Sequence, residues 1–541
     1  MNARARATLG VVRTRNGAEG LRFWYGGDYN PEQWPRDVWD EDVRLMQRAG
    51  VTVATVGVFS WAKLEPSDGA FDFEWLDDVL DRLHAGGIRV DLATATASPP
   101  PWLALAHPDM LPVTEDGTRL SIGSRQHYSP SSATYRRYSD RLVRALAERY
   151  GRHPALEAWH VNNELACHVH DDYSDESAVA FRRWLEERYG DVETLNEAWG
   201  TAFWSQAYGS FTEVMPPRAA PTYRNPTQLL DWNRFSSDAW LAVYRAEAAI
   251  LREVTPDVPV TTNFMGFFKP ADYWRWAQEL DFVSDDHYVD PADPTAPVLA
   301  AMSHDLMRSL GGGRPWILME QATSAVNWRP RNAPKPPGMH RLLSLQAAAR
   351  GADGIMQFQW RQSKAGAEKF HSAMVPHAGE DSRVFREAVA LGAELADLAD
   401  VLGQRQHARV AILFDWDSWW ALEQEATPAR LSYLTVVLRW YRELWRRGVL
   451  VDFARPDGAV SGYDVVIAPA TQVLSEAAQA NLAGYVTGGG RLVATYQTAV
   501  LDERLHVLLG GYLGALRRVL GVRIEEFAPP AEPSGLSLIH I

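Results

Sequence analysis

The segment VTVATVGVFSWAKLEPSDGAFDFEWLDDVLDRLHAGGIRVDLATA (51–95) contains one complete strand–helix–strand pattern. The run at 51–59 and the apolar run at 88–95 are typical of buried strands, and residues 75–84 between them have the apolar spacing of a helix. Two strands joined through a helix run parallel, because the helix returns the chain to the same edge of the sheet. The segment therefore predicts an α/β fold with a parallel sheet.

The same alternation extends outward from this segment over about the first 400 residues. Strand-like runs occur at 23–29, 51–59, 88–95, 156–161, 258–263, 282–288, 315–319 and 354–358, and helical patterns at 38–49, 75–84, 176–189 and 231–254. Eight such strands with intervening helices predict a (β/α)₈ TIM barrel over residues 21–400. The connection between the third and fourth strands is long, and no element is assigned to it. An open, doubly wound sheet is the alternative on periodicity alone.

A second, smaller α/β unit is predicted at 405–527. Its strand-like runs are 410–414, 449–453, 465–468 and 491–495, and its helical patterns are 431–446 and 476–486, which together predict a Rossmann-like domain. Gly488, Gly489 and Gly490 follow a helix and precede a strand, the reverse of a dinucleotide-binding fingerprint, so no cofactor is expected. Residues 1–20 are expected to form a flexible tail, and 528–541 a linker with a truncated or foreign tail.

Composition excludes several classes of protein. The 541 residues carry 54 Lys and Arg against 68 Asp and Glu, a formal charge of −14 without a basic tract, which argues against a nucleic acid partner. No run has the length of a membrane span, and no secretion signal is evident, so a cytoplasmic protein is expected. The single cysteine, Cys167, excludes an internal disulfide and any metal site that needs two thiolates. Many of the 22 Trp residues lie beside polar residues, where indole rings can stack on sugars, although a role as large core residues explains most of them.

Two glutamates stand at the ends of strand-like runs. Glu164 closes AWHVNNE (158–164), and Glu320 is the fifth residue of WILMEQ (316–321). Apolar residues lead into each carboxylate, so both are expected at the mouth of the barrel, where the carboxyl ends of the strands form the active face. Glycosidic hydrolysis needs such a pair, one group to protonate the leaving oxygen and one to meet the oxocarbenium-like centre. For either residue alone, a structural ion pair is the alternative.

The chain resembles the glycoside hydrolase family 42 β-galactosidases from about Phe23 to Phe527. The resemblance is carried by strings that occur in order along the chain, among them GGDYNPEQWP (26–35), SRQHYSPSS (124–132), NNELACH (162–168), LMEQ (318–321) and MQFQWRQSKAGAEKFHSAM (356–374). The Asn-Glu dipeptide alone is weak, because many related barrels share it. All the strings in order are a specific signal.

The resemblance implies roles that agree with the positions of the two glutamates. Glu164 is expected to be the general acid/base and Glu320 the nucleophile of a retaining hydrolase. Asn163 is expected to hydrogen-bond the sugar 2-hydroxyl, and Arg125 matches the active-site arginine of the family, within reach of Glu164 or a sugar hydroxyl. Tyr288 is expected to donate a hydrogen bond to Glu320 and so to favour the ionised nucleophile. A structural ion pair for Arg125 and a packing role for Tyr288 are the alternatives.

Four further residues are expected to bind the sugar. Trp328 matches a sugar-contacting tryptophan of the family, and Glu368 and His371 match a pair expected to hold galactose hydroxyls. The spacing of that pair would point both side chains the same way if the segment were helical, and hydrogen bonds of this kind discriminate between sugar epimers. Trp204 is a weaker candidate for the wall of the cleft. Core packing for the tryptophans and a surface pair for Glu368 and His371 are the alternatives.

The chain departs from the resemblance at a metal site. Many family members bind a structural zinc through four cysteines, and the corresponding positions here are Ser129, Tyr173, Asp175 and Ala178. That zinc site cannot form, and a solvated polar loop is expected around His168, His170, Asp171 and Asp172 rather than another metal site. No metal dependence is therefore expected.

The sequence thus predicts a retaining hydrolase that releases terminal β-D-galactose from a small galactoside or oligosaccharide. Three alternatives stay open: an α-L-arabinopyranosidase, another retaining barrel glycosidase such as a β-glucosidase or mannanase, and a non-catalytic sugar-binding protein. The carboxyl groups of Glu164 and Glu320 are expected about 5 Å apart. The second unit resembles the family's trimerisation module, so a homotrimer is expected.

Overall fold

A computed structural model describes residues 22–529 of the chain. The expected tail at 1–20, and the expected tail at 528–541 from residue 530 onward, lie outside the described residues. The described chain divides into two units: residues 22–184 with 234–407, and residues 185–233 with 408–529. Each unit has its own parallel sheet.

The sheet of the first unit is a nearly closed barrel. Its strands are β1 (Trp24–Tyr29), β2 (Val53–Val56), β3 (Arg89–Ala93), β4 (Leu156–His160), β5 (Val260–Thr261), β6 (Asn263–Phe264), β7 (Ser284–Asp286), β8 (Trp316–Glu320) and β9 (Ala352–Gln357). They lie in the order β5-β4-β3-β2-β1-β9-β8-β7-β6, and every pair is parallel. Only Thr262 separates β5 from β6, so the two ends of the sheet adjoin along the chain. Each of the eight expected runs contains strand, and the fifth contains two short pieces.

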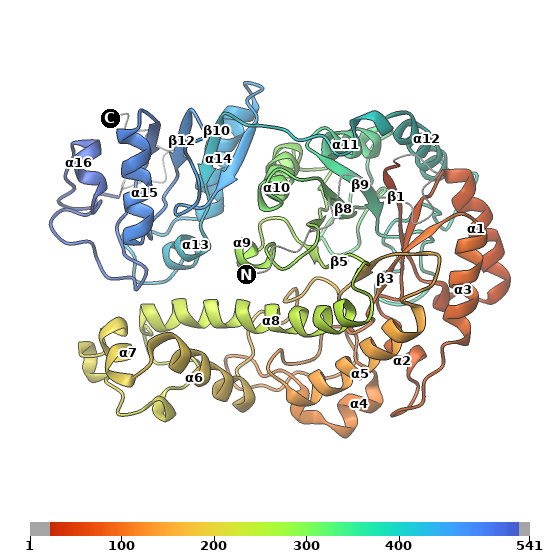
Figure 1. The fold of residues 1–541 in the computed structure, drawn as a ribbon, viewed down its shortest axis with the longest axis horizontal. Helices are drawn as coiled ribbons and strands as arrows, with labels where there is room; N and C mark the ends of the chain where they lie inside the picture. The colour runs from red at the N-terminus through yellow and green to blue at the C-terminus, as the bar shows by residue number, and fades with distance from the viewer. Residues whose placement is uncertain (1–21, 530–541) are drawn as a thin grey trace. The chain divides into compact units, whose positions relative to one another are not determined.

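Helices follow the strands and cover the outside of the barrel, as the ribbon of α1, α3, α11 and α12 shows (Figure 1). The longer helices of this part of the chain are α1 (Arg36–Ala49), α3 (Glu74–Ala85), α5 (Ala133–Tyr150), α6 (Asp175–Tyr189), α8 (Pro226–Val254), α10 (Ala296–Leu310), α11 (Met339–Ala348) and α12 (Arg383–Asp397). Apolar side chains fill the barrel, and Trp24 packs edge-on against Phe282 with ring centroids 5.5 Å apart. Burial of this kind is the main force that holds the unit together.

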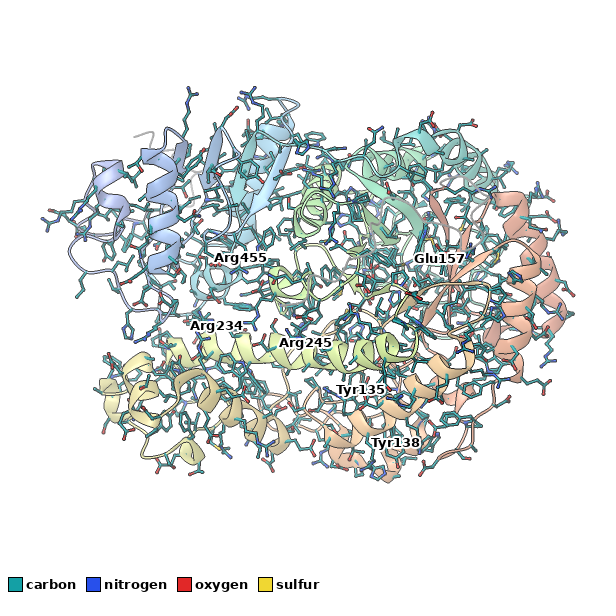
Figure 2. All side chains as sticks on the ribbon, in the orientation of Figure 1. Tyr135, Tyr138, Glu157, Arg234, Arg245 and Arg455 are labelled. Atoms are coloured by element: carbon teal, nitrogen blue, oxygen red, sulfur yellow. The ribbon has the colours of Figure 1, made fainter. Side chains whose placement is uncertain are left out.

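The long connection between β3 and β4 contains α4 (Pro101–Ala106) and α5, which the sequence did not predict. α5 begins at a Ser132 cap, whose hydroxyl oxygen accepts a hydrogen bond from the backbone N–H of Tyr135. Its buried face includes Tyr135, Tyr138 and Leu142 (Figure 2 labels the two tyrosines). Arginines and tyrosines dominate the segment, which obscures the apolar spacing of a helix.

The second unit has four parallel strands: β10 (Val410–Leu413), β11 (Val451–Ala454), β12 (Val465–Ala468) and β13 (Arg491–Ala494), in the order β11-β10-β12-β13. Its helices include α13 (Trp416–Leu422), α14 (Tyr433–Trp445), α15 (Glu476–Thr487), α16 (Leu516–Leu520) and, from the 185–233 segment, α7 (Val192–Trp199). Within residues 22–529, no helix combines the length and the apolar character needed to cross a membrane.

Candidate active site

Three carboxylates meet at the carboxyl ends of the barrel strands. Glu164 follows β4, Asp286 is the last residue of β7 and Glu320 is the last residue of β8. One oxygen of each lies within 4.8 Å of an oxygen of the others, and all three side chains are buried. Retaining glycosidases hold their two carboxyl groups about 5 Å apart, whereas inverting enzymes need roughly 6.5–9.5 Å to admit a water. The separation of Glu164 from Glu320 therefore favours the retaining geometry.

An unusual backbone presents Glu164. Its φ is +43°, and Asn162 and Ala166 nearby have φ values of +59° and +71°, all in the left-handed region that L-residues rarely adopt. Gln126 restrains this turn, because its side-chain amide donates to the backbone carbonyls of Asn163 (2.6 Å) and Glu164 (2.9 Å). Strain of this kind persists only where the surroundings fix the backbone. The loop is thus built to hold one carboxylate in place.

Arg125 is the cation that faces Glu164. Its Nη2 donates to Glu164 Oε2 at 2.8 Å, and its Nε donates to His168 Nε2 at 3.0 Å. His168 must be neutral on that nitrogen to accept, in keeping with burial and the Arg125 charge, which lower the pKa of its imidazole. The guanidinium also lies 5.5 Å from the ring centre of Phe59. Arg125 therefore contacts Oε2 of Glu164 rather than Oε1.

Glu320 receives the hydrogen bond that the sequence predicted. The Tyr288 hydroxyl donates to Oε2, and Asn263 Nδ2 lies 3.4 Å from Oε1. Burial and the negative charge of Glu164 raise the pKa of Glu320 to about 8, although the Tyr288 bond and the Arg125 charge lower it. Tyr288 does favour the ionised form, as expected, but burial and like charge outweigh it. The net effect of burial and like charge is that the pKa of Glu320 lies above its ordinary value.

An aromatic wall stands beside Glu320. The exposed indole of Trp328 lies 4.8 Å from the Tyr288 ring and 5.2 Å from the His371 ring, and Phe358 lies 4.9 Å from His371. Trp328 is 51% exposed, so part of its indole surface remains accessible beside these rings. The structure therefore brings together the predicted residues Trp328, Tyr288 and His371.

His371 is prepared to accept a hydrogen bond. Its ring is buried, and its Nδ1 lies 2.9 Å from the backbone carbonyl of Ser372, so that nitrogen carries the proton. Burial lowers the pKa of His371 to about 4, which keeps the imidazole neutral. Nε2 has no hydrogen-bond partner among residues 22–529. A buried acceptor without a partner costs free energy that a bound hydroxyl would recover.

The remaining predicted residues differ in what the structure says of them. Glu368 is half-buried, and burial raises the pKa of its carboxyl while the Arg125 charge lowers it, which places it on the same side of the site. Residues 368–371 form a turn closed by a 2.9 Å bond from His371 N–H to the Glu368 carbonyl, rather than the helix that the spacing allowed. Trp204 belongs to the second unit, where its ring packs on Phe203 at 4.8 Å, so its place in the cleft stays a prediction.

Sequence reasoning gave no role to Asp28, Asp286 or Asn263, which the structure places at the same site. Burial and the neighbouring carboxylates raise the pKa of both Asp28 and Asp286 well above the usual range. Asn263 contacts Asp286 and Glu320 through its side-chain amide. Asp28 and Asp286 end strand-like runs, which was the signal available; Asn263 ends the fifth run but is uncharged.

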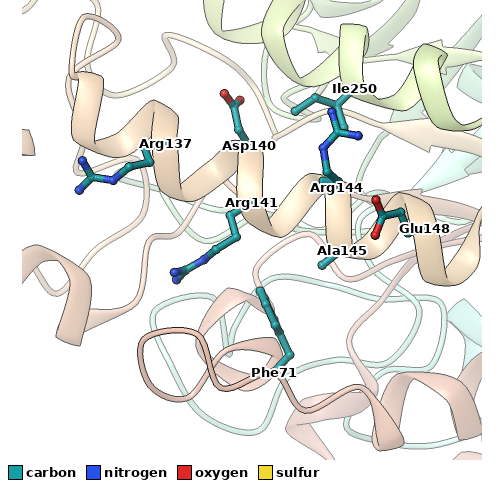
Figure 3. A pocket seen from close by; sticks show the side chains of 8 residues that line it. All are labelled: Phe71, Arg137, Asp140, Arg141, Arg144, Ala145, Glu148 and Ile250. Atoms are coloured by element: carbon teal, nitrogen blue, oxygen red, sulfur yellow. The ribbon is translucent and has the colours of Figure 1, made fainter.

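A depression over α5 is a separate feature of the first unit. Its lining includes Phe71, Arg137, Arg141 and Arg144, drawn in Figure 3 with the other side chains around it. Arg141 pairs with Glu65, and Arg144 donates to both carboxylate oxygens of Glu253. Because these two guanidiniums already have carboxylate partners, the depression does not offer a set of unpaired cations to an anionic ligand.

Comparison with known proteins assigns the family. The family profile described as β-galactosidase matches residues 28–398, and the profile of the β-galactosidase trimerisation domain matches 408–534. The chain belongs to the glycoside hydrolase family 42 β-galactosidases. A β-galactosidase of an Arthrobacter species is 54% identical over 98% of this chain and 77% of the relative, and one of Geobacillus kaustophilus is 54% identical over 94% and 76%. The crystal structure of a Bacillus circulans β-galactosidase superposes with a TM-score of 0.91 at 41% identity, over 95% of this chain and 77% of that one.

In this family 42 chain, a buried carboxylate ties the loop after Glu164. Asp172 Oδ2 accepts hydrogen bonds from the hydroxyls of Ser129 (2.5 Å), Ser174 (2.6 Å) and Ser177 (2.5 Å), and Oδ1 accepts from the backbone N–H of Val113 (2.8 Å). The expectation of a solvated loop is therefore wrong for Asp172, which is 3% exposed. Several donors around one carboxylate hold together segments that are distant in sequence.

We expect Asp172→Ala to lower the free energy of unfolding by about 3–5 kcal/mol, because it leaves several buried donors without an acceptor. Denaturant unfolding followed by circular dichroism measures the change. The matched control is Asp257→Ala at an exposed position, expected within about 0.5 kcal/mol of the wild type. Equal effects of the two substitutions would contradict the role given to Asp172.

Because the pKa of Glu320 is raised in the folded state, the folding stability of this family 42 protein should depend on pH. A carboxyl whose pKa is about 8 folded, against the ordinary 4.5, binds its proton more tightly in the folded state. Its favourable contribution is complete below pH 4.5 and is lost as the pH rises toward 8. Glutamine resembles the protonated form, so Glu320→Gln should be more stable than the wild type by about 1–3 kcal/mol at pH 8, with a smaller difference at pH 5.

Scanning calorimetry at both pH values checks this expectation, with Glu148→Gln at an exposed position of α5 as the control. A Tm of Glu320→Gln that matches the wild type at pH 8, or a difference that grows toward pH 5, would contradict it.

Proposed function

We propose that this protein is a retaining β-galactosidase that releases terminal, non-reducing β-D-galactose by double displacement. The observation that carries the proposal is the pair of buried carboxylates, Glu164 and Glu320, within 4.8 Å of each other at the mouth of a family 42 barrel. The spacing supports the retaining stereochemistry. The relatives with 53–54% identity to this chain are β-galactosidases, which supports the substrate class.

In the first step, Glu320 attacks the anomeric carbon while Glu164 protonates the leaving oxygen. Tyr288 and Asn263 are donors to Glu320 and stabilise its ionised form. In the reactive state, the proton for the leaving oxygen is on Oε1 of Glu164, since Arg125 occupies Oε2. Breaking the glycosidic bond neutralises Glu320 and leaves Glu164 as a carboxylate.

In the second step, Glu164 removes a proton from water, and the water oxygen attacks the anomeric carbon from the face that the leaving group vacated. This attack breaks the ester bond to Glu320, which leaves as a carboxylate. Two inversions give net retention, and the pair returns to its starting protonation. Because one carboxyl must be ionised and the other protonated, the pH dependence of kcat/KM is expected to be bell-shaped.

Galactose recognition is proposed to rest on His371, Glu368 and Trp328. Nε2 of His371 accepts a hydrogen bond from a sugar hydroxyl, and Trp328 stacks on the apolar face of the ring. Epimers that misplace the hydroxyl leave Nε2 buried and unpaired, which costs about 1–3 kcal/mol.

We expect His371→Phe, which keeps the ring packing but loses the acceptor, to lower kcat/KM for the β-galactoside by about 10–100-fold. The preference for β-galactoside over β-glucoside should fall with it. Kinetics on both aryl glycosides measure the change. An unaltered preference would show that His371 does not read the sugar.

Product analysis tests the function itself. Proton NMR during the first turnovers should show β-galactose before mutarotation. Rates on aryl β-galactoside, α-L-arabinopyranoside and β-glucoside separate the rivals, and lactose with β-1,3, β-1,4 and β-1,6 galactobioses tests the linkage. If the arabinopyranoside is cleaved faster than the galactoside, the protein is an α-L-arabinopyranosidase. If the glucoside is cleaved faster, it is another retaining glycosidase. Binding of sugar without turnover would indicate a non-catalytic sugar-binding protein.

We also propose that the protein is a homotrimer. Each chain would consist of a catalytic barrel near residues 21–400 and a smaller α/β domain near residues 405–527. The profile of a β-galactosidase trimerisation domain over 408–534, on a four-stranded parallel sheet of the Rossmann-like kind, supports an oligomer. Sedimentation velocity tests the trimer, and a monomer at micromolar concentration would contradict it. A cytoplasmic location is part of the same proposal, and cell fractionation tests it.

The residues present do not call for a metal. Glu164, Asp286 and Glu320 are close enough to share an ion, but Arg125, Tyr288 and Asn263 already supply donors to these carboxylates.

A further inference from the structure

One side-chain amide contacts both halves of the catalytic pair. Asn263, the first residue of β6, is 2% exposed. Its Nδ2 lies 2.9 Å from Asn163 Oδ1, 2.5 Å from Asp286 Oδ2 and 3.4 Å from Glu320 Oε1. Its Oδ1 lies 2.8 Å from the backbone nitrogen of Glu164. Asn263 therefore bridges the acid/base side of the site and the nucleophile side.

The partners fix which way this amide points. A backbone N–H can only donate, so the atom that faces the nitrogen of Glu164 must be the oxygen of Asn263. The amino group then faces the oxygens of Asn163, Asp286 and Glu320, all of which can accept. A reversed amide would set oxygen against oxygen at these acceptors and would leave the Glu164 N–H without a partner.

A buried histidine, His160, stabilises this orientation of the Asn263 amide through a hydrogen bond. His160, at the end of β4, places Nε2 3.1 Å from Asn263 Oδ1 and Nδ1 3.1 Å from Asp91 Oδ2. Because Asn263 presents an oxygen, Nε2 of His160 must carry a proton and donate it. Nδ1 faces a carboxylate oxygen of Asp91, which accepts, so Nδ1 of His160 carries a proton as well. Asp91 in turn accepts a hydrogen bond from the Thr55 hydroxyl at 3.2 Å.

The hydrogen-bonded chain thus crosses the barrel interior from strand to strand. Thr55 lies on β2, Asp91 on β3, His160 on β4 and Asn263 on β6. Burial opposes a charged imidazole, but the Asp91 carboxylate and the Asn263 oxygen outweigh it and raise the pKa of His160. The acidic groups near the pair are Asp91, which contacts the imidazole, Glu320, which helps to raise the pKa of His160, and Asp28, whose own pKa is raised in part by Asp91. The pair supplies a fixed donor beneath a cluster of acids.

We propose that Asn263 is a positioning residue that sets the separation and orientation of Glu164 and Glu320, and that the proton on His160 Nε2 holds its amide in the working orientation. The inference rests on the proposed double-displacement function. Asn263 acts through its neighbours: its oxygen anchors the backbone of Glu164, and its amino group donates toward Glu320 and holds the side chain of Asn163. Displacements of about 1 Å in such groups can cost 100-fold in rate.

Asn263→Asp is the sharpest test, because it keeps the shape but replaces the donor by an oxygen and adds an acid beside Asp286 and Glu320. We expect kcat to fall about 100-fold, with KM changed by less than about threefold because the sugar is still bound. A like charge disfavours ionisation, so the pKa of the nucleophile should rise. The ascending limb of the kcat/KM profile should therefore move to higher pH by about one unit.

Two substitutions of His160 distinguish the effect of its hydrogen-bond donor from the effect of its side-chain volume. In His160→Gln the amide nitrogen can replace Nε2, whereas His160→Met keeps the bulk without a donor. We expect kcat within about threefold of the wild type for Gln and at least a tenfold loss for Met, the range seen when outer partners of catalytic groups are removed. The control is Asn481→Asp in the second unit, which loses donors to the carbonyls of Pro456 and Gly458. It is expected to leave kcat and the pH profile unchanged.

Labelling with a 2-deoxy-2-fluoro-β-galactoside that has an activated leaving group counts correctly folded sites, because it traps the nucleophile. Full labelling of Asn263→Asp at a slower rate supports positioning, and a reduced labelled fraction that accounts for the whole loss of kcat overturns it. Wild-type values of kcat and pH profile in Asn263→Asp, or equal losses in the two His160 variants, also overturn it. If the wild type itself does not cleave galactosides, the proposed function fails instead.

Discussion

Replacing Glu320 by alanine is expected to reduce kcat on every β-galactoside by at least about 10⁴-fold, because no covalent intermediate can form. Substrate should still bind, since Trp328, His371 and Arg125 remain. The loss should be the same for good and poor leaving groups. Steady-state kinetics on lactose and on 2,4-dinitrophenyl β-galactoside measure it, with traces of wild-type enzyme removed by prior labelling.

Adding azide tests the role of Glu320 through the anomeric configuration of the product. In Glu320→Ala the small anion fits the space of the lost carboxylate and attacks the anomeric carbon directly, so the product should be α-galactosyl azide. Restored turnover with β-galactosyl azide would instead assign Glu320 as the acid/base. Retention of more than a few per cent of wild-type activity without azide would show that Glu320 is not the nucleophile.

Glu164→Gln is expected to lower kcat on lactose by about 10²–10⁴-fold, the usual contribution of a general acid. Glutamine keeps the acceptor for Arg125 Nη2 but has no acidic proton for the leaving oxygen. With 2,4-dinitrophenyl β-galactoside, the first step needs little protonation, so a rapid burst of phenolate should precede slow turnover. Stopped-flow absorbance measures the burst, and azide should then speed turnover and give β-galactosyl azide.

The contrast between the two variants is what assigns the roles. Glu164→Gln should depend strongly on the leaving group and give the β-azide, whereas Glu320→Ala should depend on it little and give the α-azide. Equal losses on lactose and on the dinitrophenyl substrate in Glu164→Gln, without a burst, would contradict the acid/base assignment.

The barrel strands could be predicted because each is a short apolar run between turns. All eight expected runs contain strand, and β4 and β8 end at or just before the glutamates. The helix α5 was missed because arginines interrupt its apolar spacing, and its cap Ser132 lies in a segment rich in serine and proline. Burial of Asp172 was missed because a carboxylate in a polar segment gives no sequence signal of its partners.

Asn263 shows why part of the active site could not be predicted from the sequence. Its contacts lie 100 positions away at Asn163, 57 positions away at Glu320 and 103 positions away at His160. An uncharged residue at the end of a strand has no local pattern that distinguishes it. The raised pKa of Glu320 was likewise unpredictable, because it depends on burial and on the distance to Glu164 across the barrel.

The parallel α/β architecture, the positions of Glu164 and Glu320 after strands, and the family could all be inferred from the amino-acid sequence. The architecture follows from the local periodicity of apolar residues, and the glutamate positions and the family follow from short motifs, all of which can be seen in the sequence alone. Three features became visible only in the folded chain. A buried carboxylate, Asp172, holds the loop after Glu164, Nε2 of His371 has no hydrogen-bond partner within residues 22–529, and the side-chain amide of Asn263 contacts both Glu164 and Glu320. Each of those depends on which atoms meet across the closed barrel, and closure brings together groups whose spacing along the chain gives no sign of contact.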